Sequence, residues 1–375
     1  MARTLTSTPR QDGFRMPGEF EPHVGCWMLW PERSDDWRSG ARPAQHAFAS
    51  VAAVIADAEP VTVCVSRAQY AAARGALPES VRLVEMSSND SWIRDCGPTF
   101  VVGREGEVRG VDWAFNAWGG LSGGLYSPWD QDDLVGEKVL EIERDARYAP
   151  SLILEGGSIE VDGEGTLVTT EQCLLNPNRN PGKSRADIEW HLREYLNVDR
   201  IIWLGEGVCQ DETSGHVDNL CRFVGPGIVA LTWTDDPSDP QHAISQDAYE
   251  RLSRAVDAKG RALEIHKIHQ PSPLHITEPE ARGVDVVPGT KPRRAGDRMP
   301  ASYVNFYIGE GIVVMPSFDD PLDARAKETV QALFPHFQTV AVPSREILLG
   351  GGGIHCITLQ EPLGRRAPRG KVSSR

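Results

Sequence analysis

Short apolar runs joined by glycine-containing turns recur along the chain. Each pair of runs is rich in β-branched and aromatic residues, and this pattern is typical of β-hairpins. The predicted hairpins are Thr99 to Val102 with Val108 to Trp113, Ser158 to Val161 with Thr166 to Thr169, Leu220 to Val224 with Ile228 to Trp233, and Val304 to Ile308 with Ile312 to Met315. Four similar units therefore follow one another in the chain.

A helical stretch follows three of the hairpins and leads to a further short apolar strand. The predicted helices and strands are Ser184 to Leu196 with Arg200 to Leu204, Ala243 to Lys259 with Ala262 to Ile268, and Pro321 to Phe334 with Phe337 to Val342. Ser184 is expected to cap its helix, and Pro321 to occupy a first helical position. The N-terminal helix Pro43 to Ala58 and strand Val61 to Val65 fit the same order, whereas Asp130 to Arg144 is only moderately helical. The repeating unit is β-β-α-β.

The fifth hairpin is missing from the linear order, and its two halves lie near opposite ends of the chain. Gly25 to Trp30 and Ile354 to Gln360 are the candidate halves. If they pair, the chain closes as a ring, which predicts a five-bladed α/β propeller with pseudo-fivefold ββαβ repeats. The alternative is a generic α/β sandwich with unrelated hairpins. Residues 1–363 are expected to form one domain, and the basic tail 364–375 to be disordered.

Polar residues that could take part in catalysis or binding share one position in this repeat. Asp95 precedes the first hairpin, Glu155 the second, and His216 with Asp218 the third. Cys356 is expected to begin the closing strand, after four consecutive glycines. Equivalent positions in a closed ring converge on its axis, where ligands bind. Taken singly, each acid would be a turn residue, the His-x-Asp pair structural and the cysteine inert.

Two other kinds of site are alternatives to a cysteine nucleophile in this part of the fold. The run Gly350 to Gly353 could cradle a phosphate, but it lacks the Lys-Ser/Thr of a P-loop. A metal could bind the side chains of His216, Asp218, Glu155 and Cys356. No HxxxH pair accompanies them, and a thiol at a glycine-rich strand start favours a nucleophile.

Charge and cysteine usage narrow the class of protein. The formal charge of −14 argues against a nucleic-acid partner and suits a cationic ligand, although solubility alone is the simpler reading. The seven cysteines form no CxxC pair, so reduced thiols are expected. No apolar run approaches the roughly 20 residues of a membrane span. Met1 to Arg15 is polar and lacks a signal core, so a cytoplasmic location is expected, without a membrane partner.

Motifs over most of the chain resemble those of the agmatine deiminase family, in the guanidino-modifying (pentein) superfamily that includes bacterial peptidyl-arginine deiminase-like enzymes. They are Met16 to His23, Gly25 to Pro31, Asn89 to Phe100, Phe115 to Gly120, Leu154 to Ser158, Gly215 to Asn219 and Gly350 to Cys356. Two positions depart from the family pattern: Gly353 stands where asparagine is expected, and Glu160 where histidine is expected. The first could loosen the loop beside Cys356, and the second is expected to be neutral.

The resemblance implies a hydrolase that acts on a C–N bond of a linear amidine and yields N-carbamoylputrescine and ammonia from agmatine, a step towards putrescine in polyamine biosynthesis. Asp95 and Asp218 would bind the planar guanidinium. Cys356 would attack as a thiolate and form a covalent thiouronium. His216 would serve as acid and base, oriented by Glu155. No cofactor and no metal would be required.

The same resemblance bears on specificity and on partners. Trp92 is a candidate wall for the four-carbon chain of the substrate, and Glu212 a candidate partner for its ammonium. Core packing is the alternative for Trp92, and an exposed loop carboxylate is the alternative for Glu212. A homo-oligomer is expected. The competing functions are deimination of arginine or peptidyl-arginine, amidino transfer, and a non-catalytic binding propeller.

Overall fold

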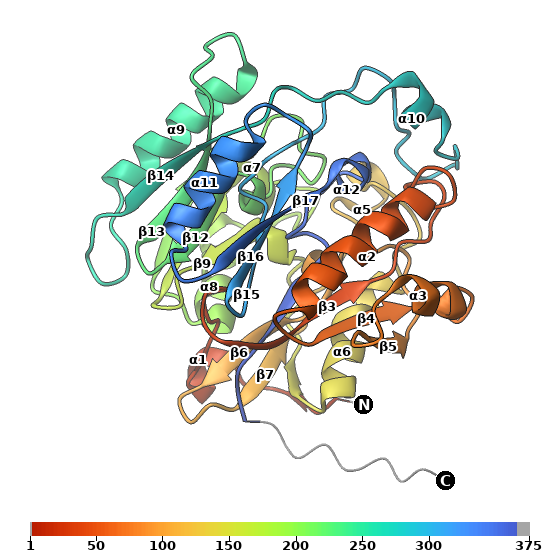
Figure 1. Cartoon of the computed structure of the whole chain (residues 1–375). Coiled ribbons are helices and arrows are strands. Elements are labelled where there is room, and N and C mark those ends of the chain that lie inside the picture. Colours follow the sequence, from red (N-terminus) through yellow and green to blue (C-terminus); the bar gives the residue numbers. More distant parts are fainter. Residues whose placement is uncertain (1, 366–375) are drawn as a thin grey trace, which may run out of the picture.

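Five β-sheets form the strand framework in the computed structural model, which describes residues 2–365 (Figure 1). In each sheet an antiparallel strand pair is continued by a strand parallel to the second one. The triplets are β18 (Leu359–Pro362), β3 (His23–Leu29) and β4 (Val61–Val65); β6 (Thr99–Gly103), β7 (Val108–Val111) and β8 (Ala146–Tyr148); β9 (Ile159–Val161), β10 (Thr166–Thr170) and β11 (Arg200–Leu204); β12 (Cys221–Gly225), β13 (Ile228–Trp233) and β14 (Glu264–His269); and β15 (Tyr307–Gly309), β16 (Ile312–Ser317) and β17 (Gln338–Pro343).

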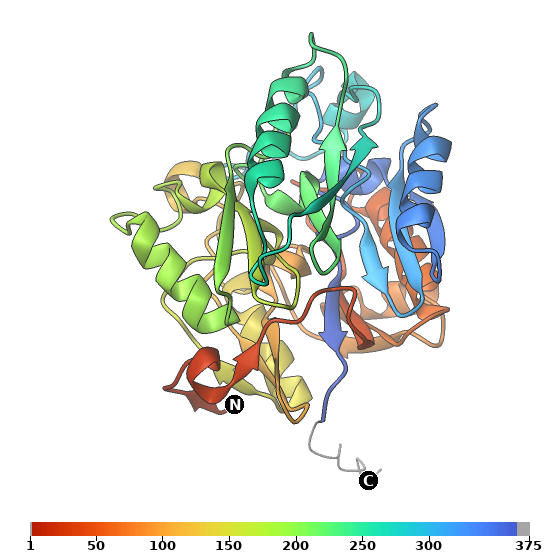
Figure 2. The same cartoon turned by 90° about the vertical axis from the view of Figure 1, so that its left-hand side faces the viewer.

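One helix of nine or more residues separates the second and third strand of every triplet, so the predicted β-β-α-β order is confirmed. These helices are α2 (Arg42–Ala56), α6 (Val135–Glu143), α8 (Arg185–Leu196), α9 (Pro240–Arg254) and α11 (Asp323–Leu333). They lie on the outside of the molecule in Figures 1 and 2. In α2 the buried residues recur at helical spacing, because one face packs against the sheets: Ala44, Ala47, Phe48, Val51, Ala52 and Ile55. The fold is mixed α/β.

The two predicted halves of the closing hairpin, which lie near opposite ends of the chain, pair in one sheet. Leu359 pairs with Trp27 and Gln360 with Cys26 in the antiparallel register of β18 and β3. The predicted start of the closing strand at Ile354 is wrong. Residues 354–358 form a turn instead, because the Thr358 hydroxyl donates back to the carbonyl of Ile354. Cys356 therefore lies in this turn, ahead of β18.

Several predicted element ends are also corrected. Helix α9 begins at Pro240 and ends at Arg254, five residues before the predicted Lys259. The Asp257 carboxylate accepts from the backbone N–H of Lys259 at 2.9 Å and holds a turn there. Helix α11 begins at Asp323, so Pro321 precedes it. The predicted cap of α8 is confirmed: Ser184 and Asp187 form a reciprocal capping box.

Smaller elements complete the framework. Strands β1 (Thr4–Leu5) and β2 (Phe14–Arg15) extend the sheet of β6, and β5 (Arg82–Glu85) extends that of β3. The short helices are α1 (Pro9–Asp12), α3 (Tyr70–Ala76), α4 (Ile93–Cys96), α5 (Gly120–Gly123), α7 (Glu171–Leu174), α10 (Glu278–Arg282) and α12 (Arg345–Leu349), with 3-10 turns η1 (Asp132–Leu134), η2 (Gly156–Ser158) and η3 (Val217–Asn219).

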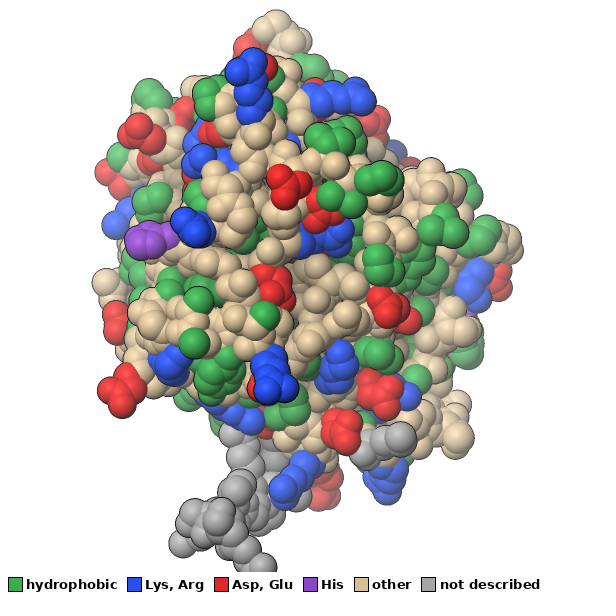
Figure 3. All heavy atoms as spheres, turned by 90° about the vertical axis from the view of Figure 1, so that its right-hand side faces the viewer, with side chains coloured by type: hydrophobic (Ala, Val, Ile, Leu, Met, Phe, Trp, Pro, Cys, Tyr) green, Lys and Arg blue, Asp and Glu red, His purple; other side chains and the backbone are tan. Residues whose placement is uncertain are grey.

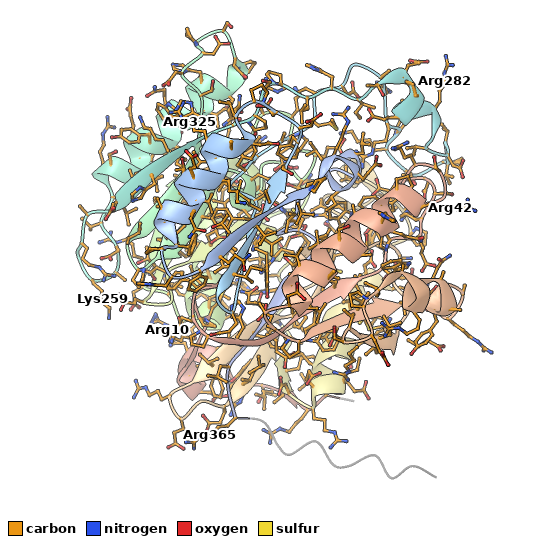
Figure 4. The ribbon with its side chains drawn as sticks, in the orientation of Figure 1. Arg10, Arg42, Lys259, Arg282, Arg325 and Arg365 are labelled. Carbon is orange, nitrogen blue, oxygen red and sulfur yellow. The ribbon has the colours of Figure 1, made fainter. Side chains whose placement is uncertain are left out.

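Charged side chains lie mainly at the periphery. On the face in Figure 3, acidic and basic side chains intermingle. The basic side chains labelled in Figure 4 project outward: Arg10, Arg42, Lys259, Arg282, Arg325 and Arg365. Within residues 2–365, no helix combines the length and apolarity that crossing a bilayer requires, and the seven cysteines are free. Of the predicted tail, residues 366–375 lie outside the described part of the chain.

Candidate active site

The predicted chemical residues lie in loops that each precede the first strand of a triplet. Asp95 belongs to α4 before β6, Glu155 precedes η2 and β9, and His216 and Asp218 flank the start of η3 before β12. Cys356 precedes β18. All five residues are buried.

Gly157 marks the point at which three of these side chains converge. A Cβ atom at this glycine would lie 2.6 Å from His216 Nδ1, 2.9 Å from Asp95 Oδ1 and 3.0 Å from Asp218 Oδ2. Because only a glycine leaves this space open, three distant loops meet around one backbone position. The predicted convergence is observed for these residues.

The thiol of Cys356 lies against two hydrogen-bond donors and one acid. The Gly353 backbone N–H donates to its Sγ over 3.3 Å, and Asn305 Nδ2 over 3.4 Å. Asp218 Oδ2 lies 3.8 Å from the same sulfur. Burial, with Asp218 and Asp95, raises the pKa of Cys356 well above its ordinary value, and the two donors oppose this rise. The free site therefore holds a thiol that needs a positive charge nearby to ionise.

The two aspartates differ in how they are held. Asp95 accepts from the Gly157 N–H and from the Trp118 indole, both over 2.9 Å. Burial, opposed by His216 and reinforced by Asp218, raises the pKa of Asp95 to about 6. Asp218 Oδ2 lies 2.7 Å from His355 Nδ1, whereas the buried Asp218 Oδ1 has no hydrogen-bond partner within residues 2–365. Burying a carboxylate oxygen without a hydrogen bond costs free energy, so Asp218 Oδ1 is available to accept a hydrogen bond from a ligand.

The imidazole of His216 lies between two carboxylates. Its Nδ1 is 3.8 Å from Asp95 Oδ2, and its Nε2 is 3.5 Å from Glu155 Oε2. Burial opposes a positive charge here, but Asp95, Cys173 and Glu155 together raise the pKa of His216 well above its ordinary value. These neighbours favour the imidazolium form of the ring.

Glu155 is held by a buried arginine that the sequence reading missed. Arg179 Nε donates to Glu155 Oε1 over 2.7 Å, and neither side chain is exposed. Burial disfavours the carboxylate, but Arg179 and His216 more than offset it and lower the pKa of Glu155 to about 2. Arg179 lies in the loop after α7, outside the repeat position shared by the other residues, so no sequence signal marked it.

Asn305 was also missed, because the predicted strand Val304 to Ile308 included it. In the structure it lies two residues before β15, whereas Asp95 and Glu155 lie four residues before β6 and β9. Its Oδ1 accepts from the His355 N–H over 2.9 Å while its Nδ2 faces Cys356. Like those two acids, Asn305 therefore precedes the first strand of its triplet.

A second layer of charge surrounds His355. Its Nε2 lies 2.7 Å from Glu19 Oε2, which is also 3.0 Å from Arg222 Nη2 and 3.2 Å from Arg94 Nη2. Burial opposes ionisation of Glu19, yet Arg222 and His355 lower its pKa well below the ordinary value. This network fixes His355, and through it the orientation of Asp218.

The two departures from the family pattern have local explanations. A Cβ atom at Gly353 would lie 2.2 Å from Asn305 Oδ1, so the Asn305 amide occupies the space beside this glycine. Glu160 forms a buried ion pair with Arg222. The loop at Gly353 is thus packed against a neighbouring side chain.

The two candidate specificity residues lie on one pocket, which also contains Trp118, Leu125, Tyr126, Lys291 and Arg293. Trp92 stacks on Trp37 with ring centroids 5.2 Å apart. The Glu212 carboxylate is already paired with the guanidinium of Arg293 and, over 3.1 Å, with Lys291 Nζ. Glu212 is therefore not an unoccupied acid in this structure.

Among residues 2–365, one group has metal-binding geometry: Glu155, Cys173 and His216. The guanidinium of Arg179 already pairs with Glu155, and a second cation there would be repelled. The metal alternative considered from the sequence used Asp218 and Cys356 together with His216 and Glu155. In the structure the group with metal-binding geometry contains Cys173 in place of those two residues.

Residues 15–362 match the family model of the Porphyromonas-type peptidyl-arginine deiminases, and the chain belongs to this family. It is 59% identical over 364 residues to a protein of Pseudomonas aeruginosa (strain UCBPP-PA14) named agmatine deiminase, covering 96% of this chain and 99% of that one. A second agmatine deiminase, of Ectopseudomonas mendocina (strain ymp), is 57% identical over 369 residues, covering 98% and 99%. The structure is similar to one described as agmatine deiminase of Enterococcus faecalis catalyzing its reaction, with a TM-score of 0.95, 50% identity and coverage of 97% and 100%.

Proposed function

We propose that this protein is an agmatine deiminase, which hydrolyses agmatine to N-carbamoylputrescine and ammonia. The observation that supports this most is the buried thiol of Cys356. Its Sγ lies 3.8 Å from Asp218 Oδ2 and near Asp95, two carboxylates that could bind a cationic substrate. Relatives of 57% and 59% identity over nearly their whole length carry this name.

In the proposed complex, Asp95 and Asp218 bind the N–H edges of the guanidinium. A planar cation with N–H groups on each edge matches two carboxylates. The unpartnered Asp218 Oδ1 supplies one acceptor. The Trp118 and Gly157 donors hold the Asp95 carboxylate in place. Fixing the plane aims its carbon at the sulfur of Cys356, which lowers the entropic part of the barrier.

The arriving cation also activates the nucleophile. Asp95 and Asp218 hold the Cys356 thiol protonated in the free site, and a guanidinium between them offsets their charge. The thiol proton passes to solvent, and the Gly353 N–H and the Asn305 amide stabilise the resulting thiolate. The thiolate adds to the guanidinium carbon, and His216 gives its proton to the departing amino group. Ammonia leaves, and a thiouronium remains on Cys356.

Water completes the reaction. His216, now neutral, takes a proton from a water molecule, which attacks the thiouronium carbon. The tetrahedral adduct collapses, its hydroxyl proton passes to the sulfur as the C–S bond breaks, and the ureido product leaves the Cys356 thiol behind. The ionised Glu155 favours the return of His216 to the imidazolium.

The same proposal extends to the architecture. We propose that the five strand triplets form a single five-bladed α/β propeller over residues 1–363, with the loops before β6, β9, β12, β15 and β18 around its axis. The recurrence of one strand order in all five triplets supports this. A closed ring would explain why residues so far apart in sequence reach one Cβ-free position at Gly157.

Ammonia release from agmatine, arginine and an arginyl peptide tests the proposal. We expect turnover of agmatine with kcat/KM far above the other two, and a ureido product identified by mass spectrometry. A higher kcat/KM for arginine or for the peptide would show that agmatine is not the preferred substrate. Transfer of the amidino group to an added amine, with no ureido product, would change the reaction class.

A further inference from the structure

Glu212 and Lys291 form an ion pair among the residues that line the pocket of Trp92. Lys291 Nζ lies 3.1 Å from Glu212 Oε1, and the lysine side chain is 50% exposed whereas the glutamate is 17% exposed. The lysine therefore reaches from solvent to an acid that is largely covered. A lysine head group is a primary ammonium on a four-carbon chain, and so is the non-reacting end of agmatine.

Residues that line this pocket also contact the reacting end. Trp118 lines the pocket and donates to Asp95. Trp92, which also lines it, lies where a Cβ atom at Gly352 would be 2.5 Å from its ring and 3.1 Å from the Cβ of Cys356. The adjacent Gly351 faces Glu212, since a Cβ atom there would be 2.8 Å from its Oε2. Two consecutive glycines thus lie beside Cys356 and Glu212, so one short loop links the reacting thiol with the acid of the ion pair.

The other charges of the pocket are not free to exchange. Arg293 is buried and donates to Asp36, to Glu212 and to the Gly350 carbonyl. Asp90 accepts from the indoles of Trp37 and Trp92, over 2.8 and 3.2 Å. Lys291, by contrast, has one partner given by the structure and a half-exposed stem, so it can leave for water at low cost.

We propose that Lys291 is a specificity-determining residue that occupies the ammonium position on Glu212 in the free enzyme and is displaced by the substrate ammonium. The inference rests on the proposed function. One primary ammonium replaces another, so the net charge around Glu212 is unchanged. A guanidinium compound without an amine cannot displace the lysine, so it does not form the ion pair with Glu212.

The test compares agmatine with N-butylguanidine, which carries the same guanidinium and no amine. Lys291→Met removes the internal competitor. We expect it to lower the KM for agmatine about three- to fivefold, the range for breaking one partly exposed ion pair, with kcat within about twofold. The KM for N-butylguanidine is expected to stay within about twofold. Lys327→Met, on the exposed face of α11, removes an equal charge elsewhere and should change neither KM.

A double-variant cycle gives the second readout. Glu212→Gln should raise the KM for agmatine, and adding Lys291→Met to it should have no further effect, because the shared partner is gone. An unchanged or raised agmatine KM in Lys291→Met, or an equal fall for both compounds, would overturn the proposal. Failure of the wild-type protein to deiminate agmatine at all would instead remove the proposed function, and the two failures are thereby distinguished.

Discussion

Replacement of Arg179 by glutamine tests whether a buried ion pair holds the acid–base side of the site. Arg179 donates to Glu155 over 2.7 Å, to Asn178 Oδ1 over 2.9 Å and to Ser214 Oγ over 3.2 Å. It also donates to the Thr213 carbonyl, so it ties Glu155 to the loop that carries His216. Arg179→Gln leaves Glu155 buried without its counterion.

Two routes give the size of the effect. Removing one partner of a buried ion pair costs about 3 to 5 kcal/mol, because an uncompensated charge remains. The Glu155 pKa of about 2, against an ordinary 4.5, corresponds to roughly 3 kcal/mol of stability, which Arg179 and His216 supply together. Since the folded-state pKa is depressed, this contribution is fully present above pH 4.5 and is lost as the pH falls towards 2. The loss in Arg179→Gln should therefore be largest near neutral pH.

Urea unfolding at pH 7.5 measures this loss. For a chain of this size the urea m-value is about 3 kcal/mol per M or more, so the midpoint should fall by about 1 M. Arg185→Gln is the matched control, because its ion pair with Glu171 is partly exposed and should contribute under about 1 kcal/mol. Turnover of Arg179→Gln should also drop at least about tenfold, since Glu155 no longer supports the imidazolium. Equal midpoints for the two variants would refute the reasoning.

Further expectations concern the reacting end. Because burial raises the pKa of Asp95 to about 6 and only its carboxylate pairs with a cation, kcat/KM should fall about tenfold per pH unit below 6; a flat profile down to pH 5 would contradict this. Gly353→Ala should lower kcat and stability, since the new methyl group would clash with the Asn305 amide. Activity equal to that of the wild type would contradict this, because it would show that the loop can shift to accommodate the methyl group. Cys356→Ser should bind agmatine in calorimetry yet show no turnover. Dialysis against a chelator should leave activity intact, and zinc-reversible inhibition would instead indicate a metal centre.

The repeat and its closing pair could be predicted because each strand carries its own local pattern. Strands β4 and β11 match their predicted bounds, since β-branched runs end at turn residues. The end of α9 could not be predicted from helical spacing alone. It depends on Asp257, whose side chain competes for backbone donors after the helix.

Site residues were predictable where the repeat phase or a motif marked them. Asp95, Glu155, His216, Asp218 and Cys356 share that phase, and the structure brings them together. Arg179 could not be found this way, because its role depends on how the loop after α7 folds back over Glu155. Glu212 was expected to pair with the substrate ammonium, and its pairing with Arg293 and Lys291 arises from a segment about 80 residues away that has no repeat signal.

The most direct measurement is mass spectrometry of enzyme quenched during turnover of agmatine. The account predicts a peptide containing Cys356 that is heavier by the mass of agmatine less one ammonia, with the addition on sulfur and absent from Cys356→Ser. Rapid turnover with this peptide unmodified at every quench time, or with the addition on another cysteine, would contradict a reaction in which this thiol displaces ammonia.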